Sequence, residues 1–114
     1  SQLRKAHRAE AATELATLAQ SQERFYARFR TYASVVDAPD GCAGTACGLE
    51  RNSTLTENEY YVLSVNGNAT SYTLTATAHG SQLDDTDCKT LTINNIGIKT
   101  ATSASGDNLT ETCW

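Results

Sequence analysis

A stripe of mostly apolar positions runs through the first thirty residues of the chain. The residues between these positions are rich in alanine and include neither glycine nor proline. Steps of three and four residues place the stripe along one face of a helix. We therefore predict a single helix over about residues 1–30. The stripe consists of Leu3, His7, Ala11, Leu15, Leu18, Gln22, Phe25 and Phe29, of which Leu15, Leu18, Phe25 and Phe29 are the expected core-packing side chains.

The start of this helix is expected to protrude from the domain. A helix of thirty residues is about 45 Å long, whereas a compact domain of this size is about 35 Å across. The large apolar residues gather in the second half of the helix, and the opening SQLRKAHR offers only Leu3. His7 is therefore expected to lie on an exposed, basic end.

Residues 60–101 change to an alternation of apolar and polar positions, which is typical of half-buried strands. Asparagine and glycine between the runs, in VNGNA and NNIG, predict hairpin turns. The apolar face of such a sheet and the apolar stripe of the helix would bury each other. The predicted fold class is α+β, with about four antiparallel strands. Their inward positions are Tyr61, Leu63 and Val65, then Tyr72, Leu74, Ala76 and Ala78, then Leu91, Ile93, Ile96 and Ile98.

Between helix and sheet, residues 31–59 show little periodicity. The segment DAPDGCAGTACG is rich in residues that form turns. A long loop is predicted here. Long loops in small domains are usually functional or held in place, and Cys42 and Cys47 can supply a local covalent link.

Composition bounds the remaining choices. With 114 residues, 39% of them hydrophobic, the chain suits one domain covering 1–114. Its apolar runs are far shorter than the roughly 20 residues of a membrane helix, and no signal peptide opens it. Four cysteines among many Ser, Thr and Asn residues suit an exported protein with disulfides. Zinc is disfavoured because Cys88 and Cys113 form no second half-site.

Candidates for chemistry are few. His7 and His79 have no partners near them in sequence, so neither is expected to be catalytic. Asp84, Asp85 and Asp87 in LDDTD suggest calcium, but the loop lacks the Gly and distal Glu of an EF-hand, which favours a solvated acidic turn. The sequons at Asn52, Asn68 and Asn108 are at the level expected by chance. We predict no catalytic, cofactor-binding or metal-binding residue.

Two long segments of the chain carry a family resemblance. They are RAEAATELATLAQSQERFYARFRTYA and CKTLTINNIGIKTATSASGDNLTETCW. They resemble the type IV pilin family, in particular minor pilins of the PilE type. The first is similar to the pilin helix with its TYA exit, and the second is similar to the closing strand pair and stapled loop of pilins, ending in Cys-Trp. The resemblance implies the pilin fold, in which a long N-terminal helix packs on the sheet and a disulfide closes the C-terminal loop.

The resemblance also implies how the cysteines pair. It joins Cys88 to Cys113, closing residues 88–113 into a loop, and leaves Cys42 for Cys47. The segment 100–112 has Leu109 as its one large apolar residue, so it is expected to fray without this link. Pilins begin with an apolar helix that anchors them in the membrane; we expect this chain to be the soluble domain without that half-helix.

The implied function is that of a minor pilin, a structural subunit of a type IV pilus or of its assembly-initiating complex, which supports pilus biogenesis and twitching motility. Its partners would be major and minor pilins, through the helix, and the inner-membrane assembly machinery. It would reside in the inner membrane with a periplasmic domain before assembly, then in the extracellular pilus. An enzymatic role is not expected.

Two alternatives remain. One is a DNA-uptake or adhesive minor pilin, and the other is a pseudopilin of type II secretion. The net charge of −4 divides into +3 over residues 1–30 and an acidic remainder. Because DNA-binding pilins rely on a basic stripe on the exposed domain, the acidic remainder argues against nucleic acid as a partner.

Overall fold

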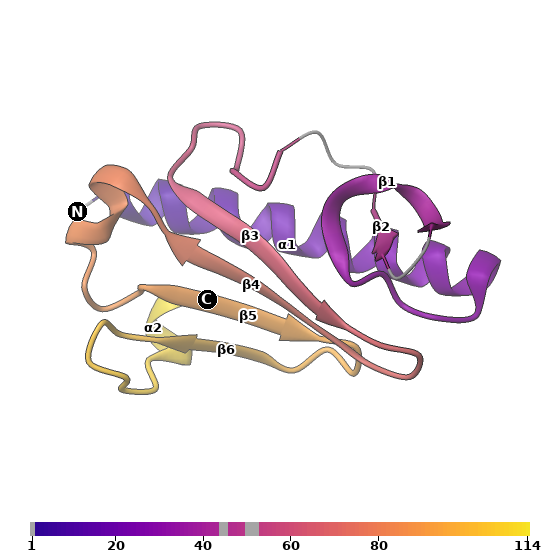
Figure 1. Ribbon diagram of the computed structural model, residues 1–114. Helices are drawn as coiled ribbons and strands as arrows, with labels where there is room; N and C mark the ends of the chain where they lie inside the picture. The colour runs from indigo at the N-terminus through magenta and orange to yellow at the C-terminus, as the bar shows by residue number, and fades with distance from the viewer. Residues whose placement is uncertain (1, 44–45, 50–52) are drawn as a thin grey trace.

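The computed structural model describes residues 2–43, 46–49 and 53–114, with side chains described except at 2, 37–43 and 46–47. Helix α1 (Gln2–Phe29) runs along the whole molecule (Figure 1). At 1.5 Å per residue it is about 42 Å long, and the longest extent of the domain is 42 Å. The helix therefore spans the domain. The expected protrusion is confined to the first turn, where Leu3 is exposed, because His7 is already buried.

One face of α1 is buried at the positions that the spacing predicts. Leu15 is fully buried, Leu18 and Phe25 nearly so, and Phe29 is half-buried with its ring 4.6 Å from that of Phe25. The helix ends at Phe29 because Arg30 adopts a left-handed φ of 59°. Across the described residues, no helix combines the length and the apolar character needed to cross a membrane.

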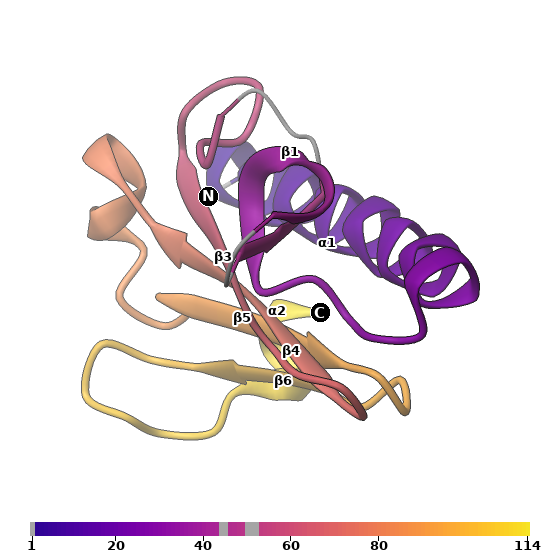
Figure 2. The ribbon, with the colours of Figure 1, turned by 45° about the vertical axis from the view of Figure 1, so that its right-hand side comes forward.

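Four antiparallel strands form the main sheet in the order β3-β4-β5-β6: β3 (Tyr61–Gly67), β4 (Tyr72–Ala78), β5 (Thr90–Asn94) and β6 (Lys99–Thr102). Helix α1 runs along one face of this sheet (Figures 1 and 2) and contacts β4 and β5. Alternate side chains of the strands are buried. The expected α+β arrangement is confirmed. The core residues that the sheet supplies are Tyr61, Leu63, Tyr72, Leu74, Ala76, Ala78, Leu91, Ile93 and Ala101.

Ile96 and Ile98 do not continue the inward face, contrary to the expectation from alternation. They lie in the β5–β6 turn, 72% and 52% exposed. The side-chain oxygen of Asn94 accepts hydrogen bonds from both of their N–H groups, at 3.1 and 3.0 Å, and Gly97 adopts a φ of 83°. These bonds to Asn94 compete with the ladder and delay the start of β6 until Lys99.

The segment predicted as a loop contains a two-stranded antiparallel hairpin, β1 (Val35–Ala43) with β2 (Ala46–Gly48). It lies against β3, beside the second half of α1 (Figure 1). Cys42 and Cys47 are directly opposite each other in its register. The predicted bond between them falls on side chains outside the described set.

The C-terminal segment folds back onto the edge of the sheet. A 3₁₀ helix, η1 (Gly80–Asp84), joins β4 to β5, and a single turn of helix, α2 (Thr110–Cys113), follows β6. Cys88 is bonded to Cys113, with Cα atoms 5.6 Å apart, so the predicted closing disulfide is confirmed. Trp114 donates from its indole nitrogen to the carbonyl oxygen of Thr100, at 2.7 Å.

Candidate functional site

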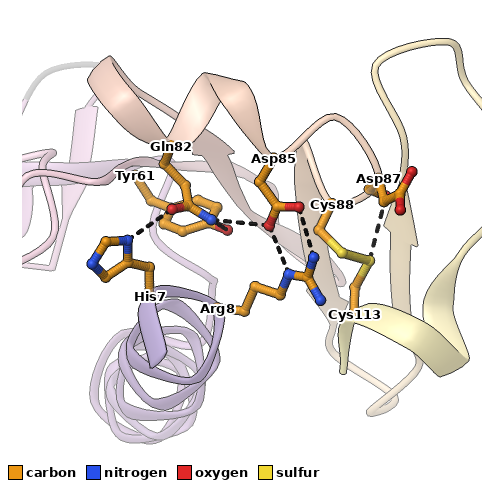
Figure 3. A network of polar contacts seen from close by, with 8 residues as sticks. All are labelled: His7, Arg8, Tyr61, Gln82, Asp85, Asp87, Cys88 and Cys113. Carbon is orange, nitrogen blue, oxygen red and sulfur yellow. Dashed lines mark hydrogen bonds and ion pairs between the residues drawn. A yellow bond between two sulfur atoms is a disulfide. The ribbon is translucent and has the colours of Figure 1, made fainter. Parts of the chain in front are cut away.

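A buried ion pair joins the start of α1 to the segment after η1. Arg8 donates from Nε and from Nη2 to the two carboxylate oxygens of Asp85, each at 2.6 Å (Figure 3). The side chains are only 14% and 4% exposed. This two-point geometry is the strongest that an arginine and a carboxylate can form, and the hydrogen bond to Asp85 raises the pKa of Arg8.

The amide of Gln82, almost fully buried, extends this pair into a network (Figure 3). Its Nε2 donates to the carboxylate of Asp85 at 3.0 Å and to the hydroxyl of Tyr61 at 3.2 Å. Its Oε1 lies 2.8 Å from Nδ1 of His7. Because Nε2 is the amide donor, Oε1 accepts here, and the proton between the two side chains resides on Nδ1 of His7.

His7 is held from a second side by an aromatic ring. Its imidazole stacks on Tyr60, with centroids 3.5 Å apart and planes 16° from parallel. We call His7, Arg8, Tyr61, Gln82 and Asp85 the clasp, since together they fix the first turns of α1 to η1 and β3. Except for the local bond between Gln82 and Asp85, its contacts join residues from distant parts of the sequence.

The clasp corrects two expectations from the sequence. His7 lies inside the domain, 8% exposed, and is not on a protruding end. Asp85 is buried against Arg8, so the LDDTD segment is not simply a solvated turn, although Asp84 and Asp87 are exposed. The sequence did contain one indication that His7 is buried, because this residue falls on the apolar stripe of α1.

Chemically, the clasp is a structural device. It presents no nucleophile beside a base, and His79 is exposed at the end of β4, outside the network. Within the ranges the structure describes, no group of three or more His, Cys, Asp or Glu side chains is placed to hold a metal ion. A buried pair with all partners present fixes one arrangement of elements, and its loss leaves a buried charge.

The face of α1 away from the sheet is the second candidate surface. Between Ala9 and Gln20 its exposed side chains are small or uncharged: Ala9, Thr13, Ala16, Thr17 and Gln20. The hydroxyls of Thr13 and Thr17 bond to carbonyl oxygens one turn back in the helix, at 2.9 and 3.1 Å, which leaves their methyl groups on the surface. The distance between packed helices depends on the side chains at the contact, so this face, called here the small-residue face, allows another helix to approach closely.

The acidic side chains that flank the small-residue face, Glu10 and Glu14, accept hydrogen bonds from the segment before β3. Glu10 accepts from the backbone N–H and the side-chain amide of Asn58, at 3.1 and 2.8 Å. Glu14 accepts from the N–H of Glu57 at 3.2 Å. These bonds hold the segment before β3 against one side of α1.

Comparisons with known proteins agree with this architecture. The sequence model of a family described as "Type IV minor pilin ComP, DNA uptake sequence receptor" matches residues 1–92. A solved structure of a type IV pilin from Shewanella oneidensis superposes with a TM-score of 0.58 and 25% sequence identity, covering 97% of each chain. No curated protein sequence matches the chain. Because the family match covers well over half of its length, the chain belongs to the family of type IV minor pilins described as ComP, DNA uptake sequence receptor.

Proposed function

We propose that this minor pilin is a structural subunit of the type IV pilus or of its assembly-initiating complex, and that it supports pilus biogenesis and twitching motility. The observation that carries the proposal is the small-residue face of α1, which is free of charged side chains from Ala9 to Gln20 although the helix crosses the whole domain. Neighbouring pilins, major or minor, would pack their helices along this face. The domain 1–114 would act as one unit and would catalyse no reaction.

The role of pilus subunit also determines in which compartments of the cell the protein would reside. Before assembly the domain would face the periplasm, held at the inner membrane by an anchoring helix upstream and delivered to the assembly machinery. It would then leave the cell within the pilus. The Cys88–Cys113 bond is in keeping with this route, because disulfides persist in the periplasm and outside the cell.

The experiment is complementation of a strain that lacks the gene. The complete protein should restore surface pili and twitching, and Ala16→Arg should not, because a long charged side chain would separate packed helices. Thr73→Arg, on the exposed sheet face, is the matched control and should complement. The variant proteins should accumulate to equal levels and melt at equal temperatures. Normal pilus numbers in the deletion strain itself would refute the proposal.

A second candidate, a receptor for DNA, is favoured by the description of the matching family. Arg24 and Arg28 are exposed one turn apart near the end of α1, and Arg30 is exposed directly after it, although the net charge of the chain is −4. A deletion strain with normal pili but defective DNA uptake would favour this role. So would micromolar binding of duplex DNA by the purified domain that weakens steeply with salt.

We also propose that Cys42 is bonded to Cys47, since the two residues are register partners in the β1–β2 hairpin. Non-reducing peptide mapping should recover this cross-linked peptide together with the 88–113 peptide. A Cys42–Cys113 or Cys47–Cys88 species as the main product would overturn the proposal.

A further inference from the structure

Three tyrosine rings lie in contact at the end of the molecule where α1, β3 and β5 end (Figure 1). The ring of Tyr32, between α1 and β1, lies 4.8 Å from that of Tyr26 on α1 and 4.8 Å from that of Tyr72 on β4. Backbone hydrogen bonds hold this arrangement. Tyr32 donates from its N–H to the carbonyl oxygen of Asn68, at 3.0 Å. Asn95 donates to the carbonyl oxygen of Tyr72, at 3.1 Å.

Two of these phenols share one carboxylate. The hydroxyls of Tyr32 and Tyr72 are both hydrogen-bonded to Glu23, and their rings are 9% and 4% exposed. Burial, with a contribution from Glu23, raises the pKa of Tyr72 to about 12 and also raises that of Tyr32, so both phenols keep their protons at neutral pH. Because both hydroxyls reach the same carboxylate, the ring carbons beside the hydroxyls are also close together. The rings meet edge to face, with planes 66° apart.

A phenol in this setting loses an electron more easily than one in water. Removal of one electron makes a phenol strongly acidic, so the cost falls when a base takes the hydroxyl proton at the same moment. The ionised carboxylate of Glu23 accepts hydrogen bonds and can accept that proton. The tyrosyl radical that remains carries much of its unpaired electron on the ring carbons beside the oxygen. Two such radicals in contact can therefore join at these carbons.

Other groups that oxidants attack readily are absent or protected. The chain has no methionine, and Cys88 is already bonded to Cys113. The ammonium of Lys99 lies over the ring of Trp114, 5.1 Å from its centroid. A positive charge in that position stabilises the ring with its electrons in place and opposes the loss of one. The indole N–H of Trp114 donates to a carbonyl oxygen, which is a far weaker base than a carboxylate.

The remaining tyrosines have different ring and hydroxyl partners. Tyr60 stacks on the imidazole of His7. The hydroxyl of Tyr61 accepts a hydrogen bond from the amide of Gln82 (Figure 3). Neither contact offers a second phenol with which a tyrosyl radical could couple.

We propose that Tyr32 and Tyr72 form an oxidative modification site, at which a one-electron oxidant such as a high-valent peroxidase haem or the carbonate radical installs a dityrosine bond within the chain. Each phenol gives one electron to an oxidant and its hydroxyl proton to Glu23, which passes it to water. The two ring carbons beside the oxygens form the new bond, and the hydrogens on those carbons move to the oxygens. The chain thus loses two electrons and two protons, and two oxidants are each reduced by one electron.

The bond would join the segment after α1 to β4, an inner strand of the sheet. This chemistry is separate from the proposed role as a pilus subunit and does not depend on it.

Photo-oxidation of the purified, dilute protein tests the site. Tris(bipyridine)ruthenium(III), generated by light with a cobalt(III) ammine as the final electron acceptor, should give a monomer two hydrogen atoms lighter that shows dityrosine fluorescence. After reduction of the disulfides, mass spectrometry should locate the bond between Tyr32 and Tyr72. Tyr72→Phe should lower the fluorescence at least five-fold, whereas the matched control Tyr26→Phe should leave it within two-fold. A bond at Tyr26 or between two copies as the main product would overturn the inference.

The proton acceptor and the protected indole supply a second arm. Glu23→Gln keeps an oxygen that accepts hydrogen bonds but cannot take up the proton, so it should slow the reaction at least five-fold, whereas Glu111→Gln, at an exposed site, should not. Heavy water should slow the parent at least two-fold, since proton and electron leave together. Lys99→Gln should raise oxidation of Trp114 at least two-fold. An unchanged rate in Glu23→Gln would refute the role of the carboxylate, and Trp114 as the main oxidised residue of the parent would refute the site.

Discussion

The side-chain amide of Gln22 in α1 forms hydrogen bonds with both the N–H and the carbonyl oxygen of Ala33, which lies between the helix and β1. Its Nε2 donates to the carbonyl oxygen of Ala33 at 2.9 Å, and its Oε1 accepts from the N–H of the same residue at 2.8 Å. Both residues are fully buried. A side-chain amide thus takes the place of a neighbouring strand, and both backbone groups of the buried Ala33 have a partner.

Replacing Gln22 by methionine, which is similar in size, should destabilise the domain by about 3 kcal/mol, since two buried backbone groups would lose their partners. Gln20→Met, two residues earlier on the exposed face, should change stability by less than about 0.5 kcal/mol. Urea denaturation followed by circular dichroism measures both. Equal losses in the two variants would show that the paired amide contributes nothing.

The clasp should behave as a coupled unit in a double-mutant cycle. Asp85→Asn and Arg8→Met should each cost about 3 kcal/mol, because either change leaves the other buried group without its partner. The double variant should cost well under the sum, since no charge is then stranded. Chemical denaturation of the four proteins supplies the cycle, and strict additivity would argue against a direct coupling.

Removal of the Cys88–Cys113 disulfide should destabilise the domain and loosen its C-terminal segment. The double variant Cys88→Ala and Cys113→Ala should lose about 3.5 kcal/mol by the loop-entropy estimate for a separation of 25 residues. Hydrogen exchange should rise first in residues 103–112, where Leu109 is half-buried and the neighbouring side chains are mostly exposed. Unchanged protection of this segment would mean that α2 docks without the bond.

Alkaline pH should destabilise the domain through its buried phenols. Burial, with a contribution from Glu23, raises the pKa of Tyr72 from 10.0 to about 12. The unfolded chain therefore loses this proton first, so the stabilising contribution of Tyr72 is complete below about pH 10 and is lost as the pH rises through 12.

The measurement is the free energy of unfolding from pH 8 to 12. Tyr72→Phe should show a shallower decline than the parent above pH 10, with its difference from the parent constant below pH 9. Some decline should remain, because burial also raises the pKa values of Tyr32 and Tyr61. Identical slopes for parent and variant would contradict the assignment.

The spacing of apolar residues along the sequence predicted which side chains of the helix and the strands are buried. The stripe through Leu15 and Leu18, and the alternation of Leu63 or Leu74 with polar neighbours, follow from the periods of helix and strand. Alternation failed at Ile96 and Ile98 because the side chain of Asn94 captures two N–H groups, which a hydropathy pattern does not register.

The features that sequence reasoning missed depend on distant partners. Strand β1 contains Pro39, Asp40 and Gly41, which favour turns, and it forms because β2 and β3 lie beside it. The bond between Arg8 and Asp85 spans 77 residues. Nothing within a window of ten or fifteen residues indicates that these charges meet.

The Cys88–Cys113 bond also has a mechanical consequence. Within a filament under tension, a chain stretched between Gln2 and Trp114 would transmit force across the sulfur atoms and bypass the enclosed residues. At about 3.4 Å per extended residue, a separation of 25 residues withholds about 85 Å of contour length from extension. Strands β5 and β6 lie inside this ring. They would therefore stay linked to each other while force unfolds the rest of the domain, and would be close together for refolding when the force is removed.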